Sequence, residues 1–190
     1  MVRALLATPP GRRIIRNRWV FDEKSDGRKR ARLVAKGFSQ VEGINYTEIF
    51  SPVVCYETAR LMIAQASLQQ WIVTSVDVKA AFLYGELDEE LYMEQPEGFQ
   101  VKSLKQLVFR LKRAIYRLKQ AAKQWWIALT KSMAKLGFRH AVSDSGVFIL
   151  TSSEGPSVIV IIYVDDTIFM GPDRNTVTKA KESFMALWEC

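Results

Sequence analysis

Two adjacent carboxylates, Asp165 and Asp166, lie inside a strongly apolar stretch of the chain. An apolar run at residues 158–164 precedes them, and the apolar segment 167–170 follows. A β-hairpin with the aspartates at its turn is the favoured geometry, because burying two unpaired carboxylates in a strand has a large desolvation cost. Such a turn can be only structural, since aspartate is common in turns. It can also present two acids to a ligand.

Asp77 is a third acid with a similar placement. It ends the apolar segment 72–76, which reads as a short strand, and Val78 follows it. If this strand is a neighbour of the hairpin, three carboxylates meet at one edge of a sheet, where repulsion raises their pKa values. Divalent metal relieves such repulsion, and Mg²⁺ prefers a few carboxylates together with water and substrate phosphate. Two such ions can activate a 3′-hydroxyl and stabilise a leaving pyrophosphate, so the acids favour phosphoryl-transfer chemistry.

The segments that must position these acids predict a mixture of hairpins and helices. Apolar patterns predict strands at residues 18–22, 32–35, 71–78, 147–150, 158–163 and 167–170. Helical spacing predicts helices at residues 57–70 and 114–136, and a third that Asn175 can cap. Because no regular strand–helix–strand rhythm is present, the predicted fold class is α+β.

The N-terminal region has its own signals. Residues 1–16 contain Pro9, Pro10 and Gly11 and are expected to form an irregular lead-in. Asp26-Gly27 is typical of a tight turn, so residues 18–35 are predicted to form a basic β-hairpin.

The net charge of +7 is unevenly distributed along the chain. Residues 1–36 carry 11 Lys or Arg against 3 acids, and residues 98–143 carry 11 Lys or Arg and no acid. Between these blocks, residues 77–97 carry 7 acids and one Lys. Basic blocks suit a polyanion such as nucleic acid, because each neutralised phosphate releases a counterion. The alternative is a solvated cationic surface.

Several other classes of protein are disfavoured by composition. No apolar run reaches the roughly 20 residues that span a bilayer, so no membrane is expected as a partner. His140 is the only histidine, which excludes a zinc cluster or a catalytic Cys–His pair. Cys55 and Cys190 are too few for a disulfide framework, so a reducing compartment is expected. No phosphate-binding glycine loop is present, and Trp125-Trp126 is interpreted as core packing rather than as a base-stacking platform.

Four blocks of sequence, in order, resemble the reverse transcriptases of copia-type retrotransposons. Tyr163-Val164-Asp165-Asp166 is similar to the YxDD signature of reverse transcriptases. Residues 77–87 and 91–99 resemble the region around the first catalytic aspartate of the copia type. Residues 32–40 and 50–53 resemble the fingers of the same family, and residues 116–120 resemble the segment beside the incoming nucleotide. The resemblance extends from about Trp19 to Leu187.

The resemblance implies a fingers-and-palm fold over residues 17–190, with an antiparallel palm sheet and packed helices. It implies an RNA-directed DNA polymerase that adds deoxynucleoside triphosphates to a primer on an RNA or DNA template. Asp77, Asp165 and Asp166 would be catalytic and, with the backbone carbonyl of Val78, would bind two Mg²⁺ ions, for which Mn²⁺ can substitute. An intracellular location, in a cytoplasmic particle or the nucleus, is also implied, and the oligomeric state is left open.

The resemblance also places residues at the nucleotide. Phe82 matches the aromatic position that blocks a ribose 2′-hydroxyl, with a core phenylalanine as the alternative. Gln120 matches a residue that lines the nucleotide pocket, with a solvent-facing helix glutamine as the alternative. Tyr163, within the YxDD signature, is counted with the nucleotide-binding residues. Arg30, Arg32 or Lys36 is expected to reach the triphosphate, and because a hairpin alternates its faces the choice among them is open.

Three residues depart from the family pattern. Ala80 stands where Asn is usual, and Arg117 and Ala122 stand where Gly and Pro are usual. The chain is also expected to end before a thumb, as a fragment or a degenerate genomic copy. A second hypothesis is therefore a catalytically inactive, nucleic-acid-binding remnant of the same fold. A third is a generic α+β binding domain whose Asp-Asp turn is only structural.

Overall fold

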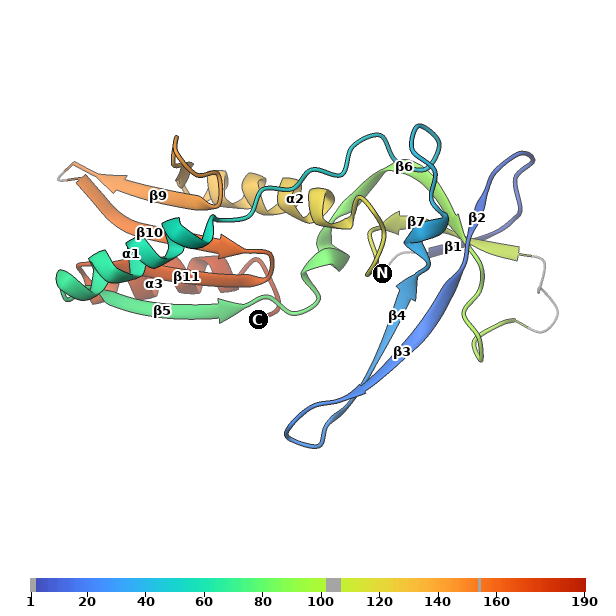
Figure 1. Ribbon diagram of the computed structural model, residues 1–190, viewed down its shortest axis with the longest axis horizontal. Helices are drawn as coiled ribbons and strands as arrows, with labels where there is room; N and C mark the ends of the chain where they lie inside the picture. Colours follow the sequence, from blue (N-terminus) through green and yellow to red (C-terminus); the bar gives the residue numbers. More distant parts are fainter. Residues whose placement is uncertain (1–2, 102–106, 154) are drawn as a thin grey trace. The chain divides into compact units, whose positions relative to one another are not determined.

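The computed structural model describes residues 3–101, 107–153 and 155–190. The chain divides into two compact units, whose elements are drawn in Figure 1. Unit 1 comprises Met1–Phe50 and Phe82–Trp125, and unit 2 comprises Ser51–Ala81 and Trp126–Cys190. None of the helices in the described part of the chain is both long and apolar enough to cross a bilayer.

Unit 2 is built on one antiparallel sheet with the strand order β5-β11-β10-β9-β8. Its strands are β5 (Ile72–Asp77), β8 (Arg139–His140), β9 (Val147–Ser152), β10 (Gly155–Tyr163) and β11 (Asp166–Gly171). The predicted hairpin around the two adjacent aspartates is β10–β11. The α+β class and the antiparallel sheet with packed helices are therefore confirmed.

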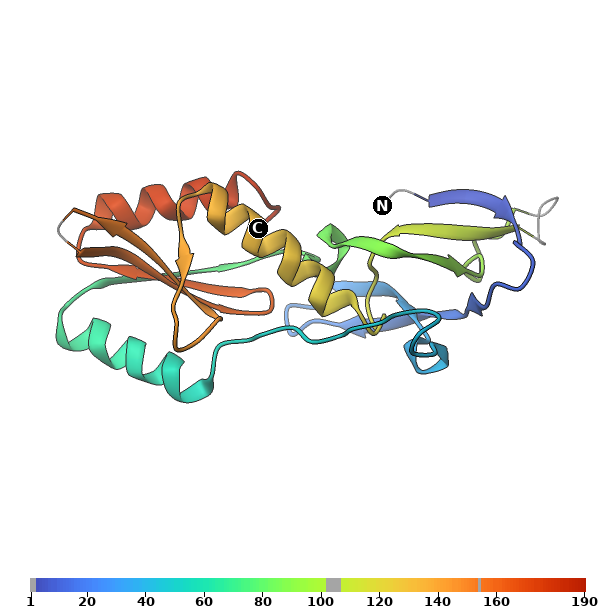
Figure 2. The same ribbon diagram turned by 90° about the horizontal axis from the view of Figure 1, so that it is seen from above.

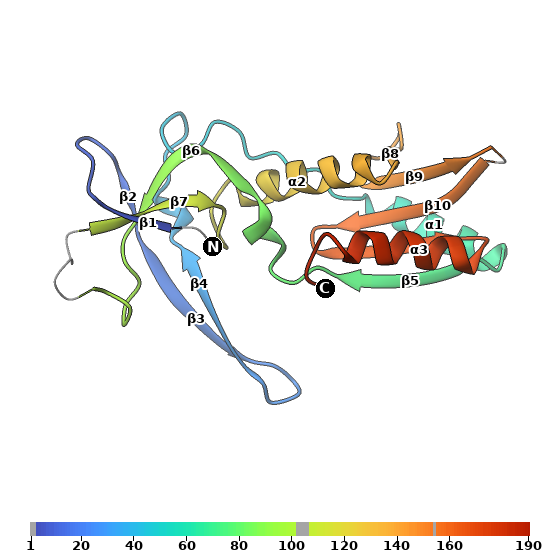
Figure 3. The ribbon, with the colours of Figure 1, turned by 180° about the vertical axis from the view of Figure 1, so that it is seen from behind.

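Helices cover both faces of this sheet. Helix α1 (Tyr56–Leu68) lies on one side and helix α3 (Arg174–Met185) on the other, as Figure 2 shows. Alternate residues of β10 face the two helices, since side chains alternate along a strand. Ile161 belongs to a core cluster with Ala66 of α1. Helix α3 packs on β5, β10 and β11 (Figure 3), and there the rings of Phe169 and Phe184 are 5.5 Å apart. Both faces of the central strands are thus buried, which holds their ends in fixed register.

Unit 1 contains a four-stranded sheet and a separate hairpin. The sheet has the order β1-β7-β6-β2, from β1 (Arg3–Ala7), β2 (Ile14–Ile15), β6 (Glu86–Met93) and β7 (Leu107–Arg113). The hairpin joins β3 (Asn17–Glu23) to β4 (Lys29–Ala35), as predicted. The expectation that residues 1–16 are irregular is wrong for β1 and β2, because pairing with distant strands orders them. Two short 3-10 helices are also present, η1 (Gly37–Ser39) and η2 (Ala81–Tyr84), and η2 begins at the last residue of a unit 2 segment.

Helix α2 (Ala121–Lys135) is shorter than the predicted helix at residues 114–136. Residues 114–120 are not helical, because the carbonyl of Tyr116 accepts the amide of Ala35 at 2.9 Å and Arg117 has a φ of +66°. At the other end, the helix stops at Lys135, close to the predicted end at residue 136, and Gly137 follows with a φ of +86°. Tertiary pairing at Tyr116 therefore overrides an apolar stripe that continues through this segment.

The N-cap of α3 also differs from the prediction. Asp173, rather than Asn175, is the N-cap, and its Oδ2 accepts the amide of Thr176 at 2.7 Å. Both residue types cap helices well, so the sequence alone favours neither position over the other.

Candidate active site

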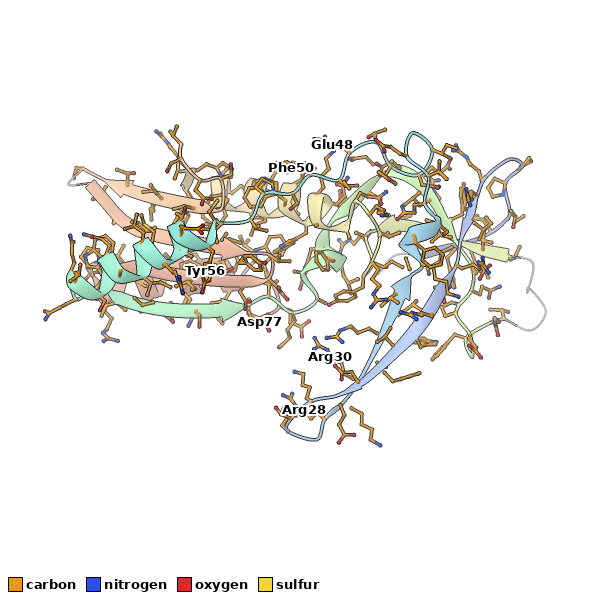
Figure 4. All side chains as sticks on the ribbon, viewed as in Figure 1. Arg28, Arg30, Glu48, Phe50, Tyr56 and Asp77 are labelled. Carbon is orange, nitrogen blue, oxygen red and sulfur yellow. The ribbon has the colours of Figure 1, made fainter. Side chains whose placement is uncertain are left out.

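Asp77 and Asp166 lie directly opposite each other on adjacent strands. Strand β11 pairs with β5 in antiparallel register, with Asp166 opposite Asp77 and Gly171 opposite Ile72. Residues that face each other across an antiparallel pair project their side chains on the same side of the sheet. The sequence left open whether these two strands are neighbours, and the pairing shows that they are. Figure 4 labels Asp77 at the end of β5.

The third acid, Asp165, lies in the two-residue turn between β10 and β11. Tyr163 pairs with Asp166 in the register of the hairpin, so Tyr163, Asp166 and Asp77 form a row across three strands. The carbonyl of Asp165 accepts the amide of Val78 at 3.1 Å, which ties the turn to the residue that follows Asp77. Tyr163 is 57% exposed, and the three acids are exposed as well.

The turn is strained. Val164, its first central residue, has a φ of +59°, in a region that a β-branched side chain enters only at a cost. Glycine or asparagine is the usual residue at such a position. Strain of this kind persists only where the surrounding structure determines the backbone. Here the register of β10 with its two neighbours supplies that constraint.

Electrostatic repulsion among the acids is visible at Asp166. Partial burial raises the pKa of the Asp166 carboxyl, and the charges of Asp165 and Asp77 raise it further. A raised carboxyl pKa means that the ionised form of Asp166 is disfavoured. A cation bound at this edge would stabilise the ionised form, because its positive charge offsets the repulsion among the carboxylates. The three acids therefore interact electrostatically, which the sequence could only suggest.

The donor chemistry of this edge suits a hard divalent cation. Among residues 3–101, 107–153 and 155–190, no three His, Cys, Asp or Glu side chains are close enough together to hold a metal ion between them. The three aspartates therefore lie at one edge of the sheet, but their carboxylates are not close enough together to hold one ion between all three. Mg²⁺ is usually bound by one or two carboxylates, with water and substrate phosphates as its remaining ligands. The edge fits that mode of binding, and metal ligation by Asp77, Val78, Asp165 and Asp166 stays a prediction.

Sequence reasoning missed the contacts made by the C-terminal residues. Lys79 donates its amide to the carbonyl of Glu189 at 2.8 Å, and its Nζ lies 3.6 Å from Glu189 Oε1. The segment that follows Asp77 is therefore held on one side by the Asp165 turn and on the other by the chain end. No local signal could have revealed a contact between residues so distant in sequence.

In unit 1, two of the three candidate triphosphate residues share a face of the β3–β4 hairpin. Arg30 lies opposite Asp22 and Arg32 lies opposite Val20, so both side chains project to the same side. Figure 4 labels Arg30 on β4. Lys36 follows the end of β4 and instead lines a cleft of about 370 Å³ with Arg18, Arg117 and Lys119. Lys36 lies beyond the last paired residue of β4, so the register of the hairpin does not fix the direction of its side chain.

Arg32 is connected to Phe82 through one ring. The Arg32 guanidinium lies 5.9 Å from the centroid of the Tyr116 ring, a distance at which cation–π attraction operates. The Phe82 and Tyr116 rings are 5.6 Å apart in an edge-to-face arrangement. Phe82 is half-buried and packs against the unit 1 core. The core alternative for Phe82 is therefore supported in part, and its role as a gate for the 2′-hydroxyl stays a prediction.

Gln120 occupies a place that neither interpretation foresaw. Its side chain has no solvent exposure, so the solvent-facing alternative is wrong. Its Oε1 accepts from Gln40 Nε2 at 3.0 Å, while its Nε2 donates to the Asn45 carbonyl at 2.8 Å and to Glu89 Oε2 at 3.2 Å. In this conformation Gln120 joins a loop to β6 and cannot line an open pocket. Nucleotide contact would require these hydrogen bonds to break.

The tryptophan pair was expected to be part of the core. Trp125 is buried within unit 1. Trp126 packs in unit 2, with its ring 5.8 Å from Phe148 and 5.6 Å from His140. The interpretation of Trp125-Trp126 as packing residues is confirmed.

Comparison with known proteins identifies the class of this fold and site. The family of reverse transcriptases (RNA-dependent DNA polymerases) matches residues 2–189, and the chain belongs to that family. The resemblance to copia-type elements is confirmed by the relatives. A retrovirus-related Pol polyprotein from transposon TNT 1-94 of Nicotiana tabacum is 41% identical over 182 residues, which are 93% of this chain and 14% of that protein.

Two further relatives extend the comparison. The Pol polyprotein from transposon RE2 of Arabidopsis thaliana is 42% identical over 171 residues, 87% of this chain and 12% of that protein. A truncated transposon Ty1-A Gag-Pol polyprotein of Saccharomyces cerevisiae is 28% identical over 169 residues, 88% of this chain and 14% of that protein. The chain thus spans between 12% and 14% of the length of these relatives.

Proposed function

We propose that this chain carries out template-directed DNA synthesis, adding deoxynucleotides to a primer paired with an RNA or DNA template. The observation that carries the proposal is the register of β5 and β11, which puts Asp77 opposite Asp166 beside the Asp165 turn. In these terms unit 2 is the palm and unit 1 the fingers. Membership of the reverse transcriptase family supports the reaction type.

In unit 2, the side chains of Asp77, Asp165 and Asp166 and the carbonyl of Val78 would hold two divalent cations, Mg²⁺ or Mn²⁺. Bound metal supplies positive charge that activates the primer 3′-hydroxyl and stabilises the leaving pyrophosphate. The contribution of the chain is to keep the acids on one exposed edge, with the turn tied to Val78. Tyr163, beside Asp166 on the same face, would contact the nucleotide.

In unit 1, Arg30 and Arg32 would bind the triphosphate, because they share one hairpin face and a guanidinium binds phosphate in a forked geometry. Phe82 would exclude the ribose 2′-hydroxyl, with Tyr116 supporting its ring. Of the three cationic candidates, Arg32 is favoured because only it is connected to Phe82 through Tyr116. The substrates are intracellular, which supports an intracellular location in a cytoplasmic particle or the nucleus.

Primer extension with Mg²⁺ tests this proposal. Asp165→Asn should abolish extension, because it removes a charged ligand while leaving the size of the side chain unchanged. Asp173→Asn is the matched control, since Asp173 caps α3 outside the site and asparagine caps helices equally well. Extension that survives Asp165→Asn, or that is lost equally in Asp173→Asn, would contradict the assignment.

A second candidate is a nucleic-acid-binding remnant of the same fold that does not extend primers. The backbone conformation supports this second candidate, because Ala80 and Arg117 have positive φ values of +53° and +66°. The family residues at these positions, Asn and Gly, tolerate this conformation at lower cost. Salt-sensitive binding of a primed template without extension would support this candidate.

A further inference from the structure

The side chain of Gln40 is a buried amide whose two polar atoms both bind the same segment of unit 1. Gln40 is 7% exposed. Its Oε1 accepts the amide of Lys119 at 2.8 Å, and its Nε2 donates to Gln120 Oε1 at 3.0 Å. Both hydrogen bonds reach residues 116–120, which connect β7 to α2 and include Tyr116. We call residues 116–120 the connecting segment and the two hydrogen bonds of Gln40 the amide link.

The amide link is one of several contacts that join the connecting segment to residues 34–40. The amide of Ala35 donates to the Tyr116 carbonyl at 2.9 Å. Gly37 packs so closely on the Arg117 carbonyl that a Cβ at this position would overlap it. The conformation of the connecting segment is therefore set by its contacts with residues that are distant in the sequence, and the amide link fixes the end that leads into α2.

Tyr116 joins the connecting segment to the proposed nucleotide-binding residues. Its ring is 5.6 Å from the Phe82 ring and 5.9 Å from the Arg32 guanidinium. The backbone near Phe82 is held separately, because Gly85 donates its amide to the Phe82 carbonyl at 3.2 Å and a Cβ at Gly85 would lie 2.8 Å from the Gln124 backbone. A shift of the connecting segment would therefore move the Tyr116 ring relative to Phe82.

Buried amides at this place suit positioning better than they suit stability. Gln120 has no solvent exposure, and its Nε2 also donates to the Asn45 carbonyl and to Glu89 Oε2. Burying an amide costs free energy unless it is hydrogen-bonded, and the net gain from each hydrogen bond is small. A hydrogen bond does add direction, because it forms only over a narrow range of distance and angle. The amide link therefore restricts the connecting segment to one conformation.

We propose that Gln40 is a positioning residue that holds the connecting segment so that Tyr116 supports Phe82, and that it thereby contributes to the rejection of ribonucleotides. The proposal rests on the proposed function, in which Phe82 excludes the ribose 2′-hydroxyl. A ring excludes one extra oxygen atom only if its position is fixed to within about 0.5 Å. Gln40 acts on this selection through Tyr116 and not through contact with the substrate.

The ratio of kcat/KM for dCTP to kcat/KM for CTP, measured by primer extension with the full chain, tests the proposal. Gln40→Met keeps the length of the side chain but removes the amide link, and it should lower this ratio by about 2- to 12-fold, the effect of one net hydrogen bond. Gln95→Met is the matched control. Gln95 is also a 7% exposed amide of unit 1, and it binds the Leu107 carbonyl at 3.0 Å and the Val101 amide at 2.9 Å. It should lower stability to a similar extent and leave the ratio unchanged.

A double substitution shows whether Gln40 acts through Tyr116. Tyr116→Ala should lower the ratio by itself, and adding Gln40→Met should lower it no further, because the ring that Gln40 positions is then absent. Hydrogen exchange is the second measurement. Gln40→Met should speed exchange in residues 116–121, where the Lys119 amide loses its acceptor, and Gln95→Met should not. Additive losses in the double variant, or equal falls of the ratio in Gln40→Met and Gln95→Met, would overturn the proposal.

Failure of this inference is distinguishable from failure of the proposed function. If the wild type extends primers and Gln40→Met keeps the full preference for dCTP, only the role of Gln40 fails. If the wild type does not extend primers, the proposed function fails and the role of Gln40 fails with it. Gln40→Glu gives the same test should Gln40→Met not fold, because it keeps the acceptor for the Lys119 amide and removes only the donor to Gln120.

Discussion

Replacing Asp166 by asparagine should stabilise the folded chain at neutral pH in the absence of divalent metal. The pKa of Asp166 is raised by partial burial and by the charges of Asp165 and Asp77. Above that pKa the ionised carboxylate is therefore less favourable in the folded state than in the unfolded state. Asparagine removes this charge while keeping a similar shape. The substitution thus trades a candidate metal ligand for stability.

The size of the gain follows from the number of like charges and their exposure. Each screened interaction between exposed charges is worth about 0.2–1 kcal/mol, and Asp166 has two such neighbours. After discounting for solvent screening, we expect a gain of about 0.5–1.5 kcal/mol at pH 7 and low salt. For a chain of this length that raises the unfolding midpoint by about 1–5 °C.

The pH dependence fixes the sign of the effect. Below the unfolded-state value of 3.8 the carboxyl is protonated in both states, so wild type and Asp166→Asn should be equally stable. As the pH rises through the raised pKa of Asp166, the wild type loses stability relative to the variant. Thermal unfolding across this pH range, in chelator and then in Mg²⁺, measures the difference. Mg²⁺ should reduce it, because bound cation offsets the repulsion in the wild type alone.

Asp144→Asn is the control, since it should behave in the opposite way. Burial would raise the pKa of Asp144, but amide hydrogen bonds from Cys55 and Gly146, each 2.9 Å long, lower it. Its contribution to stability is thus present at neutral pH and is lost as the pH falls through the lowered pKa. Lower stability of Asp166→Asn than of wild type at pH 7 without metal would refute the reasoning.

Three further substitutions test the backbone and packing around the site. Arg117→Gly should raise the free energy of unfolding by about 1 kcal/mol in urea unfolding, because glycine adopts the φ of +66° without strain. The control Lys119→Gly, two residues later, should lower the free energy of unfolding. Equal losses of stability in the two variants would contradict this account. Val164→Gly should likewise stabilise the chain by about 1 kcal/mol in thermal unfolding. It should also lower the rate of primer extension, because a more flexible turn positions Asp165 less well. A loss of stability in this variant would show that the turn is not strained. Gln120→Ala should cost about 2–4 kcal/mol, because several buried polar groups lose partners. An unchanged unfolding midpoint with a raised KM for nucleotide would instead show that Gln120 acts on substrate.

Local patterns were sufficient where an element and its partner are close in sequence. The β10–β11 hairpin was predictable because two apolar runs flank a pair of aspartates, and β3–β4 because Asp26-Gly27 marks its turn. Helix α1 followed from its apolar spacing. The placement of each aspartate at the end of a strand was also predictable, because an apolar run adjoins each one in the sequence. What the sequence could not give is the register that sets Asp166 opposite Asp77.

Elements set by distant pairing were missed. Strand β1 exists because it pairs with β7, with Arg3 opposite Leu111, and its own proline- and glycine-rich surroundings indicated a loop. The start of α2 was misplaced because Tyr116 bridges to Val34 instead of joining the helix. Gln120 was misjudged for the same reason, since its partners lie in a loop and a strand that are distant in sequence.

Strain at the turn favours a functional over a purely structural interpretation of the two aspartates. Val158, Val160 and Ile162 of β10 are almost completely buried, and each contributes about 1.5–3 kcal/mol by burial. That sum exceeds the cost of about 1–3 kcal/mol for Val164 at a positive φ, so the strand can hold the turn in an unfavourable conformation. A turn shaped only for stability would place glycine or asparagine there and would separate like charges. A strained valine beside repelling acids on an exposed edge supports the proposal that this edge binds a cationic ligand.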